Sequence, residues 1–202
     1  MNSNVDIVET DVLEAPEVIE AVANETKLTT WALDSAHSSA GFSVRHLMIT
    51  NVHGDFRELS GTLVLNRAHI EQSSVNITIN PASIETHEPG RDAHLKSADF
   101  FDVEKYPDIT FHSTKWSHKS DDELFVRGDL TMHGVTKEVT LTVEGPTGEI
   151  VDPYGQRKIG FSAQTKINRK DFGLGWNMIL EAGGLGVSEE VKINIEAQFA
   201  AK

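Results

Sequence analysis

Apolar and polar residues alternate with a period of two over most of the chain that follows Trp31. A β-strand presents successive side chains to opposite faces, so this alternation predicts strands with one buried and one solvent-exposed face. The clearest segments span residues 40–45, 75–80, 139–144, 159–163 and 191–197. Several such strands joined by turn-like spacers indicate an all-β fold, with antiparallel strands arranged in a sandwich or a barrel.

Residues 50–65 form a long run for a single strand, which could extend about 50 Å at ~3.3 Å per residue. Gly54 and Gly61 are the expected bend points within it, because glycine inside a strand often marks a bulge or a sharp bend. Two segments interrupt the alternation. Residues 87–106 have a helical pattern around 91–97 and are expected to form a connection across the sheet or a barrel mouth. Residues 169–174 are expected to form a shorter connection that is not a strand.

The first 28 residues differ in composition from the rest of the chain. They are acidic and contain no aromatic residue and no glycine. We therefore divide the chain into a flexible acidic extension, residues 1–28, and a β-barrel domain, residues 29–202. Pro16 would suit the first turn of a short helix, which is the alternative structure for the extension.

Charge and composition exclude several classes of protein. The 202 residues include 18 Lys and Arg against 31 Asp and Glu, which gives a formal net charge of −13. A nucleic-acid partner is not expected, because nucleic-acid binding requires a basic surface. No apolar run approaches the ~18 residues that cross a bilayer, so stable membrane insertion is not expected. The chain begins without the basic and uninterrupted apolar segments of a secretory signal, which favours a cytoplasmic location.

Residues with catalytic or metal-binding chemistry are sparse. The chain has no cysteine, which removes disulfides, thiolate nucleophiles and cysteine-based metal sites. Neither the G-x-S-x-G elbow nor the P-loop pattern occurs. The nine histidines show neither H-x-x-x-H nor H-x-H spacing, so no metal site is expected. We therefore expect a protein without catalytic residues or a cofactor, and not an enzyme.

The interior of the predicted barrel is apolar, but the pattern leaves its contents open. A barrel of about eight strands has an interior just wide enough for side chains or for one small ligand. The inward faces mix bulky residues such as Phe42, Phe111 and Phe161 with small ones such as Ala40 and Ala163. A slender cavity and a filled core would use the same residues.

Five segments of the sequence resemble, in the same order, the signature segments of the YceI family. They cover residues 34–46 (DSAHSSAGFSVRH), 52–63 (VHGDFRELSGTL), 91–107 (RDAHLKSADFFDVEKYP), 128–137 (GDLTMHGVTK) and 161–177 (FSAQTKINRKDFGLGWN), followed by Gly186 and Val187. The segment 91–107 is the most distinctive. The resemblance covers about residues 30–200 and leaves the acidic extension outside it.

The resemblance implies an elongated, lipocalin-like antiparallel β-barrel that binds a polyisoprenoid chain in its interior. The expected function is therefore non-enzymatic binding of a long isoprenoid or a similar amphiphilic lipid, as a carrier, store or sensor. Two alternatives remain: an isoprenoid-quinone-linked enzyme or redox accessory protein, and a stress-associated scaffold with a filled barrel. Many members of the family are exported, and the resemblance also suggests a homodimer.

Strand parity and the two interrupting segments give the candidate ligand contacts. The apolar candidates are Phe42, Val44, Phe56, Ile77, Ile79, Leu95, Phe100, Phe111, Leu130, Val139, Leu141, Phe161, Phe172, Trp176 and Ile193. The polar candidates for a lipid head group are Arg91, His94 and Asn168. The alternative role for Arg91 is pairing or capping within its own connection, together with Asp92.

Overall fold

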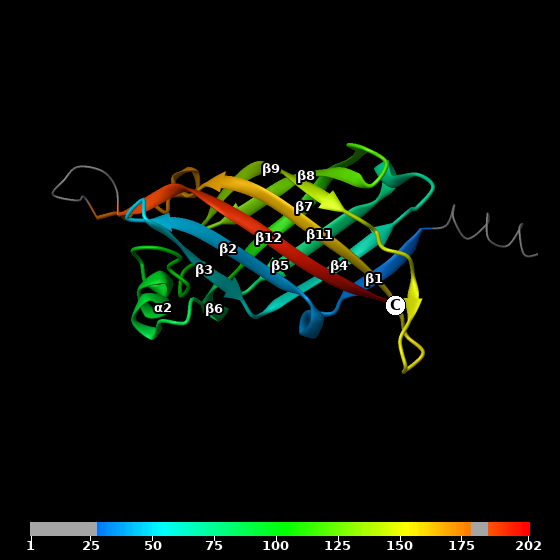
Figure 1. Cartoon of the computed structure of the whole chain (residues 1–202), viewed down its shortest axis with the longest axis horizontal. Coiled ribbons are helices and arrows are strands. Elements are labelled where there is room, and N and C mark those ends of the chain that lie inside the picture. Colours follow the sequence, from blue (N-terminus) through cyan, green and yellow to red (C-terminus); the bar gives the residue numbers. More distant parts are fainter. Residues whose placement is uncertain (1–27, 179–185) are drawn as a thin grey trace, which may run out of the picture.

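The computed structural model describes residues 28–178 and 186–202, so that the predicted acidic extension lies outside it apart from Leu28 (Figure 1). The strands are β1 (Thr29–Leu33), β2 (Ser39–His46), β3 (Thr50–Phe56), β4 (Leu59–Leu65), β5 (Ser74–Ile79), β6 (Ile84–Glu85), β7 (Ile109–His118), β8 (Glu123–Met132), β9 (Val135–Glu144), β10 (Ile150–Val151), β11 (Arg157–Asn168) and β12 (Val187–Ala201). The described residues contain one α-helix, α2 (Pro89–Lys96). Short 3₁₀ turns are η1 (Ser35–His37), η2 (Ile70–Gln72), η3 (Pro81–Ser83) and η4 (Arg169–Phe172).

The strands form a closed antiparallel barrel, as the alternation and the resemblance predict. Around the barrel the order is β1, β4, β5, β7, β8, β9, β11 and β12, and β12 closes it by pairing with β1. The β11–β12 ladder is the longest, running from Lys158 opposite Ala200 to Asn168 opposite Glu190. The second edge of β12 pairs with β2 over its first part and with β1 at its end. Strands β2, β3 and β6 therefore extend one end of the barrel wall.

Residues 50–65 form two strands and not one bent strand, which corrects the expectation from the sequence. The chain leaves strand geometry at Arg57 and Glu58. β3 pairs with β2 and β6, whereas β4 pairs with β1 and β5. The break is needed because the two halves join different parts of the sheet.

Gly54 and Gly61 allow close packing and do not bend the strand. The register between β2 and β3 continues unbroken through the pair of Phe42 and Gly54. A Cβ atom at Gly54 would lie 2.5 Å from Cζ of Phe42, and one at Gly61 would lie 2.5 Å from Cδ1 of Ile77. Both distances are far shorter than a carbon–carbon contact allows. The glycines thus make room for two side chains that the sequence places in the interior.

One end of the barrel, which we call the mouth, carries α2, η4 and the turn between β2 and β3 (Figure 1). The opposite end is filled by side chains that are almost completely buried, among them Trp31, Leu65, Ile159 and Phe199. The α2 helix has eight residues, and in the part of the chain that the structure describes no helix is long and apolar enough to cross a membrane.

An ion pair links strands at the filled end of the barrel. Lys158 of β11 lies 2.7 Å from Oδ2 of Asp34, and the two side chains are only 11% and 15% exposed. The same carboxylate oxygen accepts a hydrogen bond from Nε2 of Gln198. The hydrogen bond from Lys158, with smaller contributions from His37 and Gln198, holds the pKa of Asp34 well below its usual range. The pair therefore joins β11, β12 and the residue that precedes η1.

Replacing Lys158 with methionine is expected to destabilise the protein by about 2–3 kcal/mol, somewhat less than the ~3–5 kcal/mol of a fully buried broken pair. The midpoint of thermal unfolding should fall by roughly 5–10 °C for a domain of this size. Because the folded-state pKa of Asp34 is lowered, the pair stabilises the fold above the ordinary carboxyl pKa of ~3.9 and loses this contribution as the pH falls below it. The difference in the free energy of unfolding between wild type and variant should therefore be largest above about pH 5 and should shrink below about pH 4.

The matched control is Lys166→Met on the same strand. Lys166 pairs with Glu190, but these side chains are 59% and 55% exposed, and exposed pairs contribute only ~0–1 kcal/mol. A Lys158→Met variant that melts no earlier than the Lys166→Met control would contradict a stabilising role for the pair.

Candidate ligand-binding cavity

A cavity of about 540 Å³ lies inside the barrel. Its wall consists of the inward-facing residues of the strands together with residues of α2 and of the segments that follow α2 and η4. Side chains of successive odd or even positions share one face, so the long strands contribute mainly alternate residues, as β11 does with Phe161, Ala163, Thr165 and Ile167. The volume lies within the ~300–1,000 Å³ typical of small-molecule sites. The barrel is thus not densely filled.

The structure brings nearly all the candidate apolar residues together around this cavity. Those that line it are Phe42, Val44, Phe56, Ile77, Ile79, Leu95, Phe100, Phe111, Leu130, Val139, Leu141, Phe161, Trp176 and Ile193. They come from six of the barrel strands and β2 and β3, and from the α2 segment and the segment after η4. Strand parity was therefore a correct guide to the inward face, while contact with a ligand stays a prediction.

Two candidates lie elsewhere. Phe172 is 2% exposed and packs with Ile109, Met132 and Ile167, which line the cavity, but it is not itself a wall residue. Asn168 is exposed, and its side chain accepts a hydrogen bond from the backbone nitrogen of Lys170 at 3.0 Å. It begins η4 as an N-cap residue, the role for which asparagine is favoured. Neither residue belongs to the cavity wall.

The α2 helix is held against β6 by contacts of Thr86. Arg91 donates from Nε to Oγ1 of Thr86 and from Nη2 to its carbonyl oxygen, both at 2.7 Å. Asp92 accepts a hydrogen bond from the backbone nitrogen of Thr86 at 2.9 Å. Glu88 caps the helix by accepting from the backbone nitrogens of Gly90 and Arg91. Arg91 and Asp92 thus both bond Thr86 within the connection, although Arg91 also belongs to the cavity wall.

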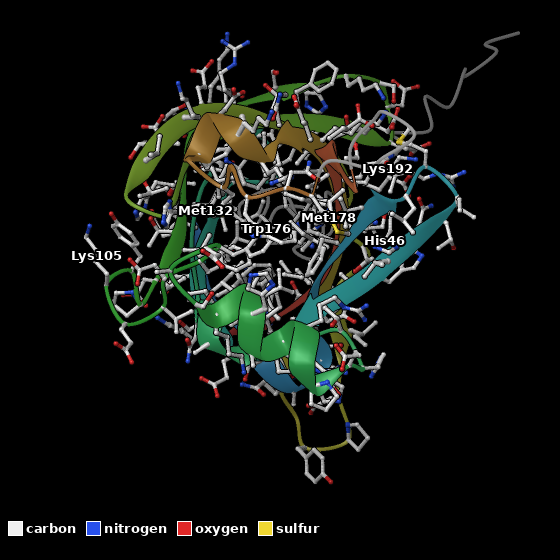
Figure 2. The ribbon with its side chains drawn as sticks, turned by 90° about the vertical axis from the view of Figure 1, so that its left-hand side faces the viewer. His46, Lys105, Met132, Trp176, Met178 and Lys192 are labelled. Atoms are coloured by element: carbon white, nitrogen blue, oxygen red, sulfur yellow. The ribbon has the colours of Figure 1, made fainter. Side chains whose placement is uncertain are left out.

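Three rings form a cluster at the mouth. His94 and Phe100 each contact Trp176, with ring centroids 4.8 and 5.2 Å apart, and His94 meets Phe100 at 5.1 Å. Nε2 of His94 lies 2.9 Å from Oδ2 of Asp99. Figure 2 looks into this end of the barrel and shows Trp176 within the opening. The cluster joins the α2 connection to the segment after η4, so the mouth is bordered by both interrupting segments.

Arg169 joins the segments at the mouth through hydrogen bonds, although its sequence pattern does not mark it as a site residue. The residue is 4% exposed and donates hydrogen bonds to the carbonyl oxygens of Leu174 (2.5 Å), Trp176 (2.8 Å) and Ser188 (2.9 Å). Burial lowers the pKa of its guanidinium, which nevertheless remains charged because the ordinary value exceeds 12. The available signal was an arginine that directly follows an alternating strand and precedes a glycine-rich turn.

Polar and titratable groups of the wall do not form a metal site. Within residues 28–178 and 186–202 no group of three or more His, Asp or Glu side chains is placed to hold a metal ion. One buried polar atom stands out: Nε1 of Trp116, a wall residue that is 4% exposed, lacks a hydrogen-bond partner in the described structure. Most buried polar groups in proteins are paired, so this unpaired indole nitrogen is an exception.

Comparison with known proteins places the chain in a family. The model of the YceI-like domain matches residues 31–199. Protein YceI of Salmonella newport is 37% identical over 176 residues, which cover 87% of each chain. The crystal structure of the Campylobacter jejuni YceI protein is 35% identical, with a TM-score of 0.66 over 84% of this chain and 96% of that one. A polyisoprenoid-binding domain from Saccharophagus degradans shares the fold at 19% identity, with a TM-score of 0.62 over 87% of this chain and all of its own. The chain is a member of the YceI-like family.

Proposed function

We propose that the protein binds a long isoprenoid chain, or a similar amphiphilic lipid, inside the barrel without catalysing a reaction on it. The observation that carries this proposal is the cavity of about 540 Å³ with an almost wholly apolar wall. Transfer of an apolar chain from water into such a cavity contributes ~25 cal/mol for each Å² of surface removed from water. The YceI family membership supports the same ligand class, and the roles proposed for the protein, as carrier, store or sensor, require binding without catalysis.

The distribution of polar groups suggests an orientation for an amphiphile. Arg91 and His94 are wall residues on α2, the helix at the mouth, where water can reach a head group. Most of the wall beyond them consists of aliphatic and aromatic side chains. A ligand with a polar end is therefore expected to lie with its tail inside the barrel and its head group near α2.

A second ligand class is favoured by Trp116. This residue lies toward the end of β7 that is remote from the mouth, and its Nε1 is unpartnered. An isoprenoid quinone bound head-first would offer a carbonyl oxygen to the indole. If so, Trp116→Phe should weaken retention of an isoprenoid quinone while leaving retention of a prenyl alcohol unchanged, because phenylalanine removes the donor and keeps an aromatic ring.

The proposal is tested by organic extraction of the purified protein followed by mass spectrometry. A long isoprenoid near one molecule per chain is the expected result. A redox-active quinone head group would support the quinone-linked alternative. An empty extract from protein that also fails to take up added isoprenoid would contradict a binding function and favour the scaffold.

The fluorescence of Trp176 provides a second test of lipid binding in the cavity. Its emission is expected to shift to longer wavelength when the bound lipid is stripped, because water then reaches the mouth cluster. The measurement uses a variant in which Trp31 and Trp116 are replaced by phenylalanine. A second variant that keeps Trp31 alone is the control, since Trp31 is 1% exposed and lies outside the cavity wall. Equal spectra of filled and stripped protein, with lipid loss verified by mass, would remove Trp176 from the site.

A further inference from the structure

Large apolar side chains are exposed beside the mouth. Met48 and Ile49, in the turn between β2 and β3, are 63% and 74% exposed, and Met178 is 50% exposed. Turns normally carry polar residues or glycine, and exposed apolar side chains that gather in one place can mark an interaction site. We call these three residues the rim.

Backbone hydrogen bonds join the two parts of the rim. The backbone nitrogen of Leu47 donates to the carbonyl of Gly186, and the nitrogen of Gly186 donates to the carbonyl of Met178, both at 2.8 Å. His46 and Trp176, which lie two positions before Met48 and Met178, line the cavity. Figure 2 shows Met178 beside Trp176 in the opening and His46 at its border. The rim therefore stands at the edge of the cavity.

The backbone of the turn fixes its exposed side chains in place. Leu47 and Met48 have φ values of 51° and 58°, in the left-handed region that residues other than glycine seldom adopt. The nitrogen of Ile49 donates to the carbonyl of His46 at 3.0 Å, which closes the turn. Strained backbone of this kind persists where the surrounding structure holds it, and it gathers at functional sites.

The part of the rim in the turn between β2 and β3 carries no acidic residue, although the chain as a whole carries −13. Residues 45–53 include Arg45 and no acidic residue. The acidic side chains at the start of β12, Glu189 and Glu190, are paired with Lys170 and Lys166. An uncharged apolar tip on an acidic protein fits an interface of zwitterionic lipids, which offers apolar depth without repelling the protein body.

We propose that the rim docks on the surface of a lipid bilayer and presents the opening of the cavity to it. Met48, Ile49 and Met178 would enter the boundary between head groups and acyl chains, so that a lipid passes between bilayer and barrel without crossing water. The transfer step rests on the proposed function, whereas docking itself does not. Docking of this kind is peripheral and agrees with the absence of a stable insertion expected from the sequence.

The first test is flotation with phosphatidylcholine vesicles. The fraction of wild-type protein that floats with the vesicles is expected to be at least ten times that of the Met48→Ser, Ile49→Ser double variant. The matched control is Ile150→Ser with Val151→Ser on β10, at the opposite end of the barrel (Figure 1). These residues are 62% and 65% exposed, so the control removes a similar apolar surface. The control should float like wild type.

A second measurement reports which end touches the lipid. Because the chain has no cysteine, Ile49→Cys and Val151→Cys each provide a single site for an environment-sensitive fluorophore. The label at position 49 should shift to shorter wavelength when vesicles are added, and the label at position 151 should not. Equal shifts at both positions, or none at position 49, would overturn the proposal.

The outcomes separate docking from ligand binding and from self-association. A double variant that floats as well as wild type would overturn docking, and so would wild type that does not float. If the rim instead joins two copies of the chain, the double variant will elute at half the mass of wild type and neither will float, which also contradicts docking. Isoprenoid in the extracts of all variants would leave the proposed function intact. Empty extracts from all of them, together with failure to take up added isoprenoid, would contradict that function without altering the flotation result.

Discussion

Replacing Ala163 with tryptophan is expected to abolish retention of ligand while the barrel still folds. Ala163 lies on β11 between Val143 and Ile195, and all three residues line the cavity. Enlarging a side chain in a packed core costs ~1–3 kcal/mol, but here the added indole projects toward open space and fills volume that the ligand needs. Mass spectrometry of organic extracts should find at least ten times less isoprenoid per chain, with a thermal midpoint close to that of wild type.

The control for this variant is Gln164→Trp, one residue further along β11. Gln164 is exposed, because neighbouring positions of a strand face opposite sides. The same indole on the outer surface should leave the lipid content unchanged. Wild-type lipid content in a folded Ala163→Trp variant would place the ligand outside the barrel. A loss of lipid in both variants would attribute the effect to surface chemistry or to general destabilisation.

The strands could be predicted from the sequence because the period of side-chain alternation is a local property. Phe42 and Val44, or Val139 and Leu141, share a face whatever strands lie beside them. Strand order and closure depend on pairs far apart in sequence, such as Trp31 opposite Ala201, which periodicity does not encode. The break at Arg57 and Glu58 was missed for this reason, because it arises from the different partners of β3 and β4.

The candidate site, like the fold, could be predicted where it depends on local alternation and not where it depends on distant contacts. Parity placed the strand residues of the cavity wall correctly, but it carries no information where the chain leaves strand geometry. Phe172 was placed in the wall on hydrophobicity alone, whereas η4 directs it into a neighbouring cluster. Arg169 donates hydrogen bonds to carbonyl groups of two segments. The sequence alone does not show that these two segments lie close together. Leu95, Phe100 and Trp176 were placed correctly because bulky apolar residues on connections require burial.

Replacing Arg169 with glutamine is expected to destabilise the protein more than Lys158→Met does at the filled end. The guanidinium satisfies the carbonyl groups of Leu174, Trp176 and Ser188, and a weaker bond of 3.4 Å reaches Val187. Hydrogen bonds to charged groups contribute ~1.5–3 kcal/mol each and do not add fully, so the loss should be about 3–5 kcal/mol. Thermal denaturation should show it, and hydrogen exchange should accelerate in residues 173–178.

The neighbouring variant Lys170→Gln separates this effect from a simple change of charge. Lys170 pairs with Glu189 through side chains that are 44% and 36% exposed, so its removal should cost less than ~1 kcal/mol. Arg169→Lys should fall between the two, because lysine keeps the charge but lacks the planar fork that reaches several carbonyls at once. If Arg169→Gln melts like Lys170→Gln and exchange in residues 173–178 is unchanged, the segment that carries Trp176 must be held by its aromatic contacts with His94 and Phe100 and not by Arg169.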